Sequence, residues 1–253
     1  MSAVGFTTLL RKEVRRFLKV AGQTVTSPVI TSVLYLVVFG QVLKGRVEVY
    51  PGVDYIAFLI PGLIMMSVIQ NSFANTSSSI TQSKIMGSIV FLLLTPLSAL
   101  EIFGAFVLAA VLRGVLVALC LYGLGWLFVP LPIAEPVQLL VMLFLSSASL
   151  AALGMIAGIL ADKFEHLAAF QNYFIMPFSF LSGVFYSIDS LPSFWAAASH
   201  FNPFFYMIDG FRRGFFGVAD VPGGLSVAVV GAFLLTISAT AVLLLRSGYK
   251  LRP

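Results

Sequence analysis

The sequence predicts an all-α integral membrane protein with six transmembrane helices. Of its 253 residues, 59% are hydrophobic and only 10% are charged. The mean hydropathy is +1.02, and the charged residues lie in short gaps between long apolar runs. Because the hydrocarbon core of a bilayer is about 30 Å thick, an apolar run of roughly 20 residues is long enough to cross it as a helix.

The apolar runs predict six spans and hence three helical hairpins. Helices are expected because lipid offers no partner to backbone N–H and C=O groups, which a helix pairs within its own segment. Pro28 and Pro61 fall inside the first two spans and predict kinks that face protein. The predicted spans are residues 25–43, 55–78, 102–128, 137–160, 167–186 and 226–246.

Residues 1–22 predict an amphipathic helix that lies along the lipid headgroups. Apolar residues such as Phe6, Leu10 and Phe17 fall near helical spacing on one side, and arginines and lysines enrich the other side. This stretch lacks the short apolar core and the small-residue cleavage site of a secretion signal. We therefore expect no cleavable signal peptide.

The distribution of the 15 Lys and Arg residues predicts that both termini lie in the cytoplasm. With the N-terminus inside, ten of them fall on the cytoplasmic side, four fall outside and Arg113 falls within a span. Cytoplasmic loops of membrane proteins carry this excess of positive charge. We attribute the net charge of +5 to contact with membrane lipids and not with nucleic acid. Arg113 needs a partner on another helix or subunit, or water.

The sequence contains no pattern that predicts catalysis. It lacks the glycine-rich phosphate loop of ATP-hydrolysing proteins, the zinc-protease motif and the nucleophile elbow of hydrolases. His166 and His200 fall on opposite sides of the predicted membrane, and Cys120 is the only cysteine. We therefore expect no metal site, no intramolecular disulfide and no cofactor on this chain, and we predict that it is not an enzyme.

Two further segments have patterns that simple spanning does not explain. Residues 82–96 combine a short amphipathic start with a turn-like end, which fits either a helix that docks a soluble partner or an ordinary interfacial loop. Residues 178–217 are apolar but are broken by glycine and proline, for example at Gly183, Pro192 and Pro203. Their dense aromatic content is typical of a membrane boundary, so a re-entrant or interfacial hairpin is expected.

The second of these segments resembles a known family. The run FLSGVFYSIDSLP at residues 180–192 and the run NPFFYMIDGFRRGF at residues 202–215 are similar to the C-terminal signature of ABC-2-type transporter permeases. That family also has a basic amphipathic N-terminal helix, six spans and a cytoplasmic segment between the second and third spans. The resemblance implies the type V, or ABC-2, exporter fold, with residues 1–253 forming a single transmembrane domain.

The resemblance implies the permease subunit of an ATP-binding cassette exporter in the bacterial inner membrane. Such a subunit forms a homodimer and binds two copies of a separate ATP-binding subunit, which carries ATP and Mg²⁺. The segment between the second and third spans would be a cytoplasmic coupling helix. Residues 188–217 would be re-entrant helices that close the outer side, and the transport path would follow the dimer interface.

The resemblance also implies roles for individual residues. Asp189, Asp209 and Arg212 are expected either to pair across the outer gate or to contact headgroups and solvent. The residues expected to couple to the ATPase are Ser83, Lys84, Ile85, Met86, Gly87, Ser88 and Ile89. Those expected at the external gate are Gly183, Asp189, Pro192, Asn202, Pro203, Asp209 and Arg212. Those expected along the pathway are Gln70, Asn71, Gln171 and Asn172.

The substrate stays open at this stage, because the family exports polysaccharides, lipid-linked glycans, lipids and drugs. Two alternative functions also stay open. An ion-coupled secondary transporter would place acidic residues near the bilayer midplane, and the predicted spans have no central Asp or Glu. A non-transporting membrane scaffold would lack an ATPase partner.

Overall fold

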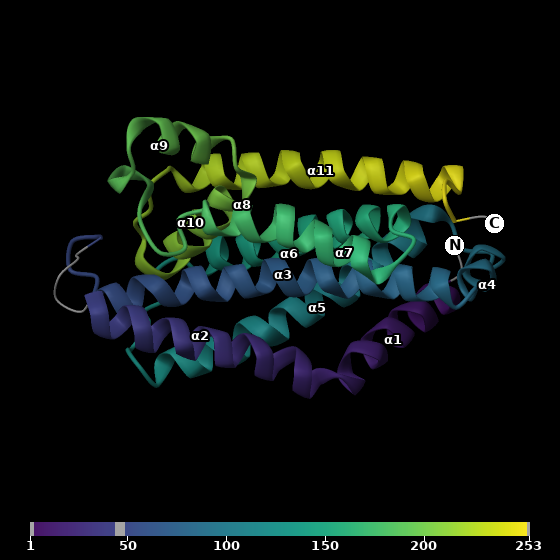
Figure 1. Cartoon of the computed structure of the whole chain (residues 1–253), viewed down its shortest axis with the longest axis horizontal. Helices are drawn as coiled ribbons and strands as arrows, with labels where there is room; N and C mark the ends of the chain where they lie inside the picture. The colour runs from purple at the N-terminus through teal and green to yellow at the C-terminus, as the bar shows by residue number, and fades with distance from the viewer. Residues whose placement is uncertain (1–2, 44–48, 252–253) are drawn as a thin grey trace.

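The computed structural model describes residues 3–43 and 49–251, and helices form most of this range. The β-pairing within this range is limited to one isolated bridge, between Tyr50 and Val53. Five of the described helices are long and apolar enough to cross a membrane, and Figure 1 shows them packed roughly along the long axis of the molecule. These are α2 (Ala21–Leu43), α3 (Tyr55–Ile85), α5 (Ala99–Trp126), α6 (Pro136–Leu160) and α11 (Gly223–Ser247).

The fifth predicted span, residues 167–186, is not one continuous α-helix. Its helical part ends at Phe180 and consists of three consecutive pieces. The middle piece is a π-helix in which the Met176 N–H donates to the Gln171 carbonyl. Pro177 explains this irregularity, because it has no N–H to donate and its ring displaces the carbonyl of the preceding turn. The pieces are α7 (Phe164–Phe170), η1 (Gln171–Ile175) and α8 (Met176–Phe180).

Apart from α7, η1 and α8, the short helices lie toward the two ends of the bundle, and α1 runs from one end along its side (Figure 1). We call one end the α4 end, because α4 lies there together with the start of α1 and the end of α11. We call the other the α10 end, because α9 and α10 lie there. The short helices are α1 (Ala3–Lys19), α4 (Ile89–Leu93), the 3₁₀ turn η2 (Ile188–Ser190), α9 (Ser193–His200) and α10 (Pro203–Phe216).

Helix α3 is the centre of the bundle. It is buried almost continuously from Tyr55 to Ile69, and α5 and α6 make its most extensive contacts. It also ends at Ile85, well beyond the predicted end of the span at residue 78. The polar residues that suggested an earlier end, such as Asn75 and Ser79, are buried inside the bundle. A polar stretch covered by protein can continue a helix that lipid would not tolerate.

Close packing of α6 on α3 depends on two glycines. Gly154 and Gly158 lie about one turn apart on α6 and face the backbone of α3. A Cβ at Gly154 would collide with the Phe73 carbonyl oxygen, and a Cβ at Gly158 would lie 2.9 Å from the Ser77 carbonyl oxygen. Small residues at this spacing let membrane helices approach each other closely.

The first prediction concerns this contact. Gly154→Ala should destabilise the fold by about 1–3 kcal/mol, because the colliding group is backbone and neither helix can yield without moving the other. Thermal unfolding of the purified protein in detergent measures the effect. Gly231→Ala on α11 is the matched control, since a Cβ there meets nothing within 4 Å. Equal melting temperatures for the two variants would contradict this account of the α3–α6 contact.

Candidate functional site

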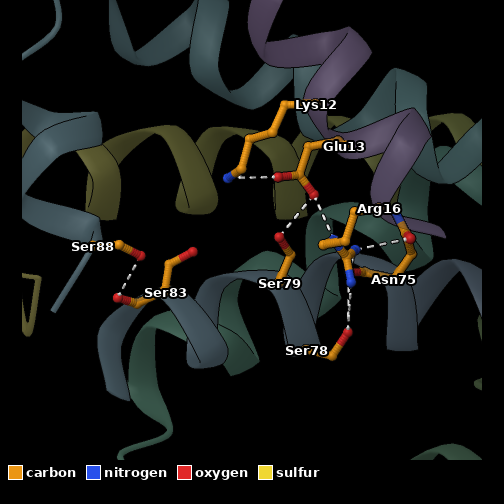
Figure 2. A network of polar contacts seen from close by, with 8 residues as sticks. All are labelled: Lys12, Glu13, Arg16, Asn75, Ser78, Ser79, Ser83 and Ser88. Carbon is orange, nitrogen blue, oxygen red and sulfur yellow. Dashed lines mark hydrogen bonds and ion pairs between the residues drawn. The ribbon is translucent and has the colours of Figure 1, made fainter. Parts of the chain in front are cut away.

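A buried carboxylate fastens α1 to α3 near the α4 end (Figure 2). Glu13 is fully buried, and its Oε2 accepts hydrogen bonds from Arg16 Nε at 3.0 Å and from Ser79 Oγ at 2.7 Å. Its Oε1 lies 3.1 Å from Lys12 Nζ. A buried charge is tolerated only when it is paired and hydrogen-bonded. Glu13 therefore depends on these partners and holds α1 in one position on α3.

Two arginines converge on Asn75 of α3. Arg16 Nη2 donates to the Asn75 backbone oxygen at 2.7 Å and to its side-chain oxygen at 3.0 Å. Arg113 Nη1 donates to the same side-chain oxygen at 3.4 Å, and its Nη2 donates to Asn71 Oδ1 at 2.9 Å. Arg113 is the intramembrane charge for which the sequence demands a partner. Its partners in the structure are two amides on α3 and not a carboxylate.

A cavity of about 580 Å³ lies beside this cluster. Its walls come from α2 and α3, with Arg113 from α5 and Gln171 from η1. Among the predicted pathway residues it brings together Gln70, Asn71 and Gln171, whereas Asn172 is exposed and does not line it. Ligand sites usually enclose about 300–1,000 Å³, so the cavity is large enough to hold a small molecule or a headgroup.

The predicted coupling residues do not form a helix of their own. Residues 83–85 are the end of α3, residues 86–88 form a turn, and Ile89 begins α4. Gly87 has a φ of +69°, a left-handed conformation that favours glycine. The short helix of this connection is therefore α4 itself, which starts where the predicted coupling segment ends.

Lys84, one of the predicted coupling residues, binds the end of α6. Its Nζ donates to the carbonyl oxygens of Ile159 and Ala161, both at 2.7 Å, and lies 3.4 Å from Asp162 Oδ1. Lys250 contacts the other oxygen of Asp162 at 3.0 Å. Hydrogen bonds from Lys250 and then Lys84 hold the pKa of Asp162 below its usual range. The ammonium group of Lys84 is therefore already occupied within the chain.

The exposed surface of this connection is apolar. Met86, Phe91 and Leu94 are 72%, 74% and 75% exposed, and Ile85 is 53% exposed. Ile89 is buried in a cluster of apolar residues from several helices, so α4 is anchored while its outer side faces away from the protein. We call the exposed set, Ile85, Met86, Phe91 and Leu94, the apolar tip.

At the α10 end, Arg212 holds the turn that follows α8. It is only 1% exposed, and its Nη2 donates to the carbonyl oxygens of Gly183 at 2.8 Å and Val184 at 3.4 Å. Its guanidinium carbon lies 3.7 Å from the centre of the Phe58 ring of α3. Gly183 has a φ of +74°, which favours glycine in this turn. In the part of the chain that the structure describes, Arg212 forms no ion pair with Asp189 or Asp209.

Two carboxylates bind the loop between α10 and α11 to the rest of this end. Asp209 is fully buried and accepts from the backbone N–H groups of Asp220 at 2.8 Å and Val221 at 3.2 Å. Asp220 in turn accepts from the hydroxyls of Tyr50 and Ser187, both at 2.8 Å. Burial raises the pKa of Tyr50 well above its usual range, so its hydroxyl stays protonated as a donor.

The remaining predicted gate residues divide into two kinds. Asn202 caps α10 with its side-chain oxygen and donates from Nδ2 to the Phe178 carbonyl at 2.7 Å, and Pro203 is the first residue of that helix. Asp189 and Pro192, in contrast, are exposed. The structure thus brings Gly183, Asn202, Asp209 and Arg212 into one buried arrangement and leaves Asp189 and Pro192 outside it.

Sequence reasoning missed Glu13 and Asp220, which hold the two ends together. The signal for Glu13 was available, because it lies four residues after Leu9 and four before Phe17, and both of these are buried. A carboxylate within the apolar stripe of an amphipathic helix indicates a buried polar partner. Asp220 lies in a loop and accepts a hydrogen bond from Tyr50, which is 170 positions away in the chain. No local sequence pattern therefore marks Asp220.

Comparison with known proteins agrees with this arrangement of apolar helices. Residues 4–216 match the ABC-2 type transporter family. The chain is 35% identical over 249 residues to the inner membrane transport permease YadH of Escherichia coli strain K12, covering 98% of this chain and 97% of YadH. It is 28% identical over 229 residues to nodulation protein J of Rhizobium meliloti strain 1021, covering 86% of each.

These matches confirm the resemblance seen in residues 180–192 and 202–215. Members of the family are the membrane subunits of ABC transporters and work with ATP-binding subunits, so the prediction that this chain is not an enzyme is also confirmed. The chain belongs to the ABC-2 type transporter family and is a multi-pass membrane transport permease.

Proposed function

We propose that this permease is the membrane half of an ATP-driven exporter in the bacterial inner membrane. It forms a homodimer, and each copy binds one ATP-binding subunit, which carries ATP and Mg²⁺. The observation that carries the proposal is the apolar tip, because exposed apolar side chains on an anchored connection are typical of a protein-docking surface. The tip replaces the predicted segment 83–89 as the contact with the ATPase, and Ile85 and Met86 belong to both.

The α4 end faces the cytoplasm in this proposal. The basic helix α1 begins there, and Lys84 and Lys250 meet Asp162 there. Positive charge concentrates on the cytoplasmic side of membrane proteins, and ATP-binding subunits work in the cytoplasm. Both predicted cytoplasmic termini and the docking surface are consistent with this orientation.

Motion at the tip reaches the membrane through α3. This helix continues without a break from the tip to Tyr55 at the α10 end, and its glycine-mediated contact with α6 resists sliding. A displaced tip therefore moves α3 and its neighbours as a rigid body. ATP binding shifts the permease between two states only to the extent that the ATP-binding subunit contacts the two states differently.

The transport path follows the face formed by α2, α3 and η1, which a second copy of the chain covers. Leu34 and Val38 on α2 and Tyr173 on η1 are exposed apolar residues on this part of the surface. The buried contacts of Arg212, Asp209 and Asp220 close the α10 end as the outer gate. The mixed polar and apolar lining of the cavity fits an amphiphilic substrate, such as a lipid or a lipid-linked glycan.

The second prediction tests the ATPase contact. Phe91→Ala should weaken association with the ATP-binding subunit by about tenfold or more, because a large exposed apolar side chain at the centre of a docking surface contributes most of its binding energy. Co-purification of the two subunits and the ATPase activity of the complex measure the effect. Phe201→Ala, at the opposite end and 89% exposed, is the matched control. Equal recovery of the ATPase with both variants would contradict the proposed contact.

The third prediction tests the orientation. In a Cys120→Ser background, an impermeant maleimide added to intact cells should label Asp189→Cys, and it should label Lys163→Cys only after the membrane is permeabilised. Both positions are exposed, and they lie at opposite ends of the bundle. The background protein without cysteine is the control for labelling. The reverse pattern would place the α4 end outside and would exclude a cytoplasmic ATPase at the tip.

A further inference from the structure

Arg113 is a partly buried cation whose charge the described residues do not neutralise. Among them, no carboxylate lies within ion-pair distance of Arg113. Glu13, the carboxylate that shares the Arg16 and Asn75 network, already binds Lys12, Arg16 and Ser79. An intramembrane charge is costly and usually marks a functional site. The balance of charge around Asn75 therefore favours an incoming anion.

Unused hydrogen-bond donors lie at the same place. A guanidinium group has five N–H donors, and Arg113 uses one on Asn71 and one on Asn75. Arg113 Nε and Asn75 Nδ2 are buried and have no hydrogen-bond partner in the described part of the chain. Buried polar groups are normally paired. Both unpaired groups are donors, and Arg113 lines the cavity whereas Asn75 does not, so the acceptor expected in the cavity is one for Arg113.

The cavity gives a ligand access to Arg113. Arg113 lines its wall together with hydroxyl and amide groups, including Ser27 and Thr31 of α2. On the adjoining face of α2, Ile30 and Leu34 are exposed apolar residues, 54% and 59% exposed. An anionic head could thus bind in the cavity while an attached apolar chain lies along α2. Arginine is the side chain best suited to phosphate, since its planar fork matches two oxygens at once.

We propose that this cavity binds a phosphate-type oxyanion at the head of an amphiphilic molecule, and that Arg113 is the residue that binds it. The inference deepens the proposed function, because it names the chemical class of what enters the transport path. The same chemistry could come from a lipid headgroup or from free phosphate. The experiment therefore treats the two sources separately.

The fourth prediction uses the purified full chain in non-ionic detergent, titrated with phosphatidic acid and followed by native mass spectrometry. Diacylglycerol with the same acyl chains is the comparison that lacks the phosphate. We expect one phosphatidic acid per chain to bind at least about tenfold more tightly than diacylglycerol, because hydrogen bonds to a charged group are the strong ones. Arg113→Gln should remove this difference, and Arg113→Lys should retain part of it.

Two variants separate the site from general effects of charge and folding. Arg246→Gln removes the same charge from an exposed position on α11 and should leave binding unchanged. Thr31→Phe fills the cavity from α2 and leaves the hydrogen bonds of Arg113 in place, so it should weaken phosphatidic acid binding even if Arg113→Gln does not fold. Competition by inorganic phosphate would identify free oxyanion as a source. Failure to compete would identify the lipid headgroup, and either result supports the Arg113 site.

The proposal is overturned if phosphatidic acid and diacylglycerol bind equally, or if folded Arg113→Gln or Thr31→Phe binds phosphatidic acid as the unmodified chain does. The measurement needs no ATP-binding subunit. Its failure would therefore leave the proposed coupling through the apolar tip intact. Conversely, loss of ATPase recruitment would leave the anion site intact.

Discussion

The polar side of α3 constrains the rest of the structure. This helix is the most deeply buried of the five long helices, yet its second half carries amides and hydroxyls that a bilayer cannot satisfy. Such groups need partners inside the protein, and most of them have one, although Asn75 Nδ2 and Thr76 Oγ1 have none in the described part of the chain. The partners described below come from three other helices, so the polar side chains of α3 determine where those helices lie. The pairs are Asn71 with Arg113 of α5, Ser72 with Ser147 of α6, and Ser79 with Glu13 of α1.

The two ends of the bundle are held by different chemistry. Near the α4 end, charged side chains bind one another and nearby backbone carbonyls, as Lys84 and Asp162 do, partly in contact with solvent. At the α10 end, the partly exposed Arg213 and Glu135 also form an ion pair, but the buried charges bind backbone groups: Arg212 donates to carbonyls, and Asp209 accepts from N–H groups. Each hydrogen bond to a buried charge is worth about 1.5–3 kcal/mol. Opening the α10 end would break several of them together.

The sequence predicted the long helices well, because bilayer thickness sets the length of an apolar run whatever surrounds it. It also predicted the family from residues 180–192 and 202–215. It could not predict how polar groups are used, because periodicity shows which side of a helix is apolar but not what covers the polar side. The sequence predicts that Lys84 contacts the ATPase, and in the structure its ammonium group binds the end of α6. The sequence leaves Arg212 either an ion pair or contact with headgroups and solvent, and in the structure it binds carbonyl groups that only the folded chain brings near it.

Helix α3 also connects the cavity with the apolar tip. Asn75 and Ile85 lie ten residues apart on this one helix, which is about 15 Å at 1.5 Å per residue. The Asn75 side-chain oxygen is shared between Arg16 of α1 and Arg113 of α5. In our proposal an anion binds the donors of Arg113 that Asn71 and Asn75 do not use, so the hydrogen bonds between α5 and α3 stay in place. Coupling between two binding sites is reciprocal: if an anion in the cavity changes how tightly an ATP-binding subunit binds the tip, the ATP-binding subunit changes the affinity of the cavity for the anion by the same factor.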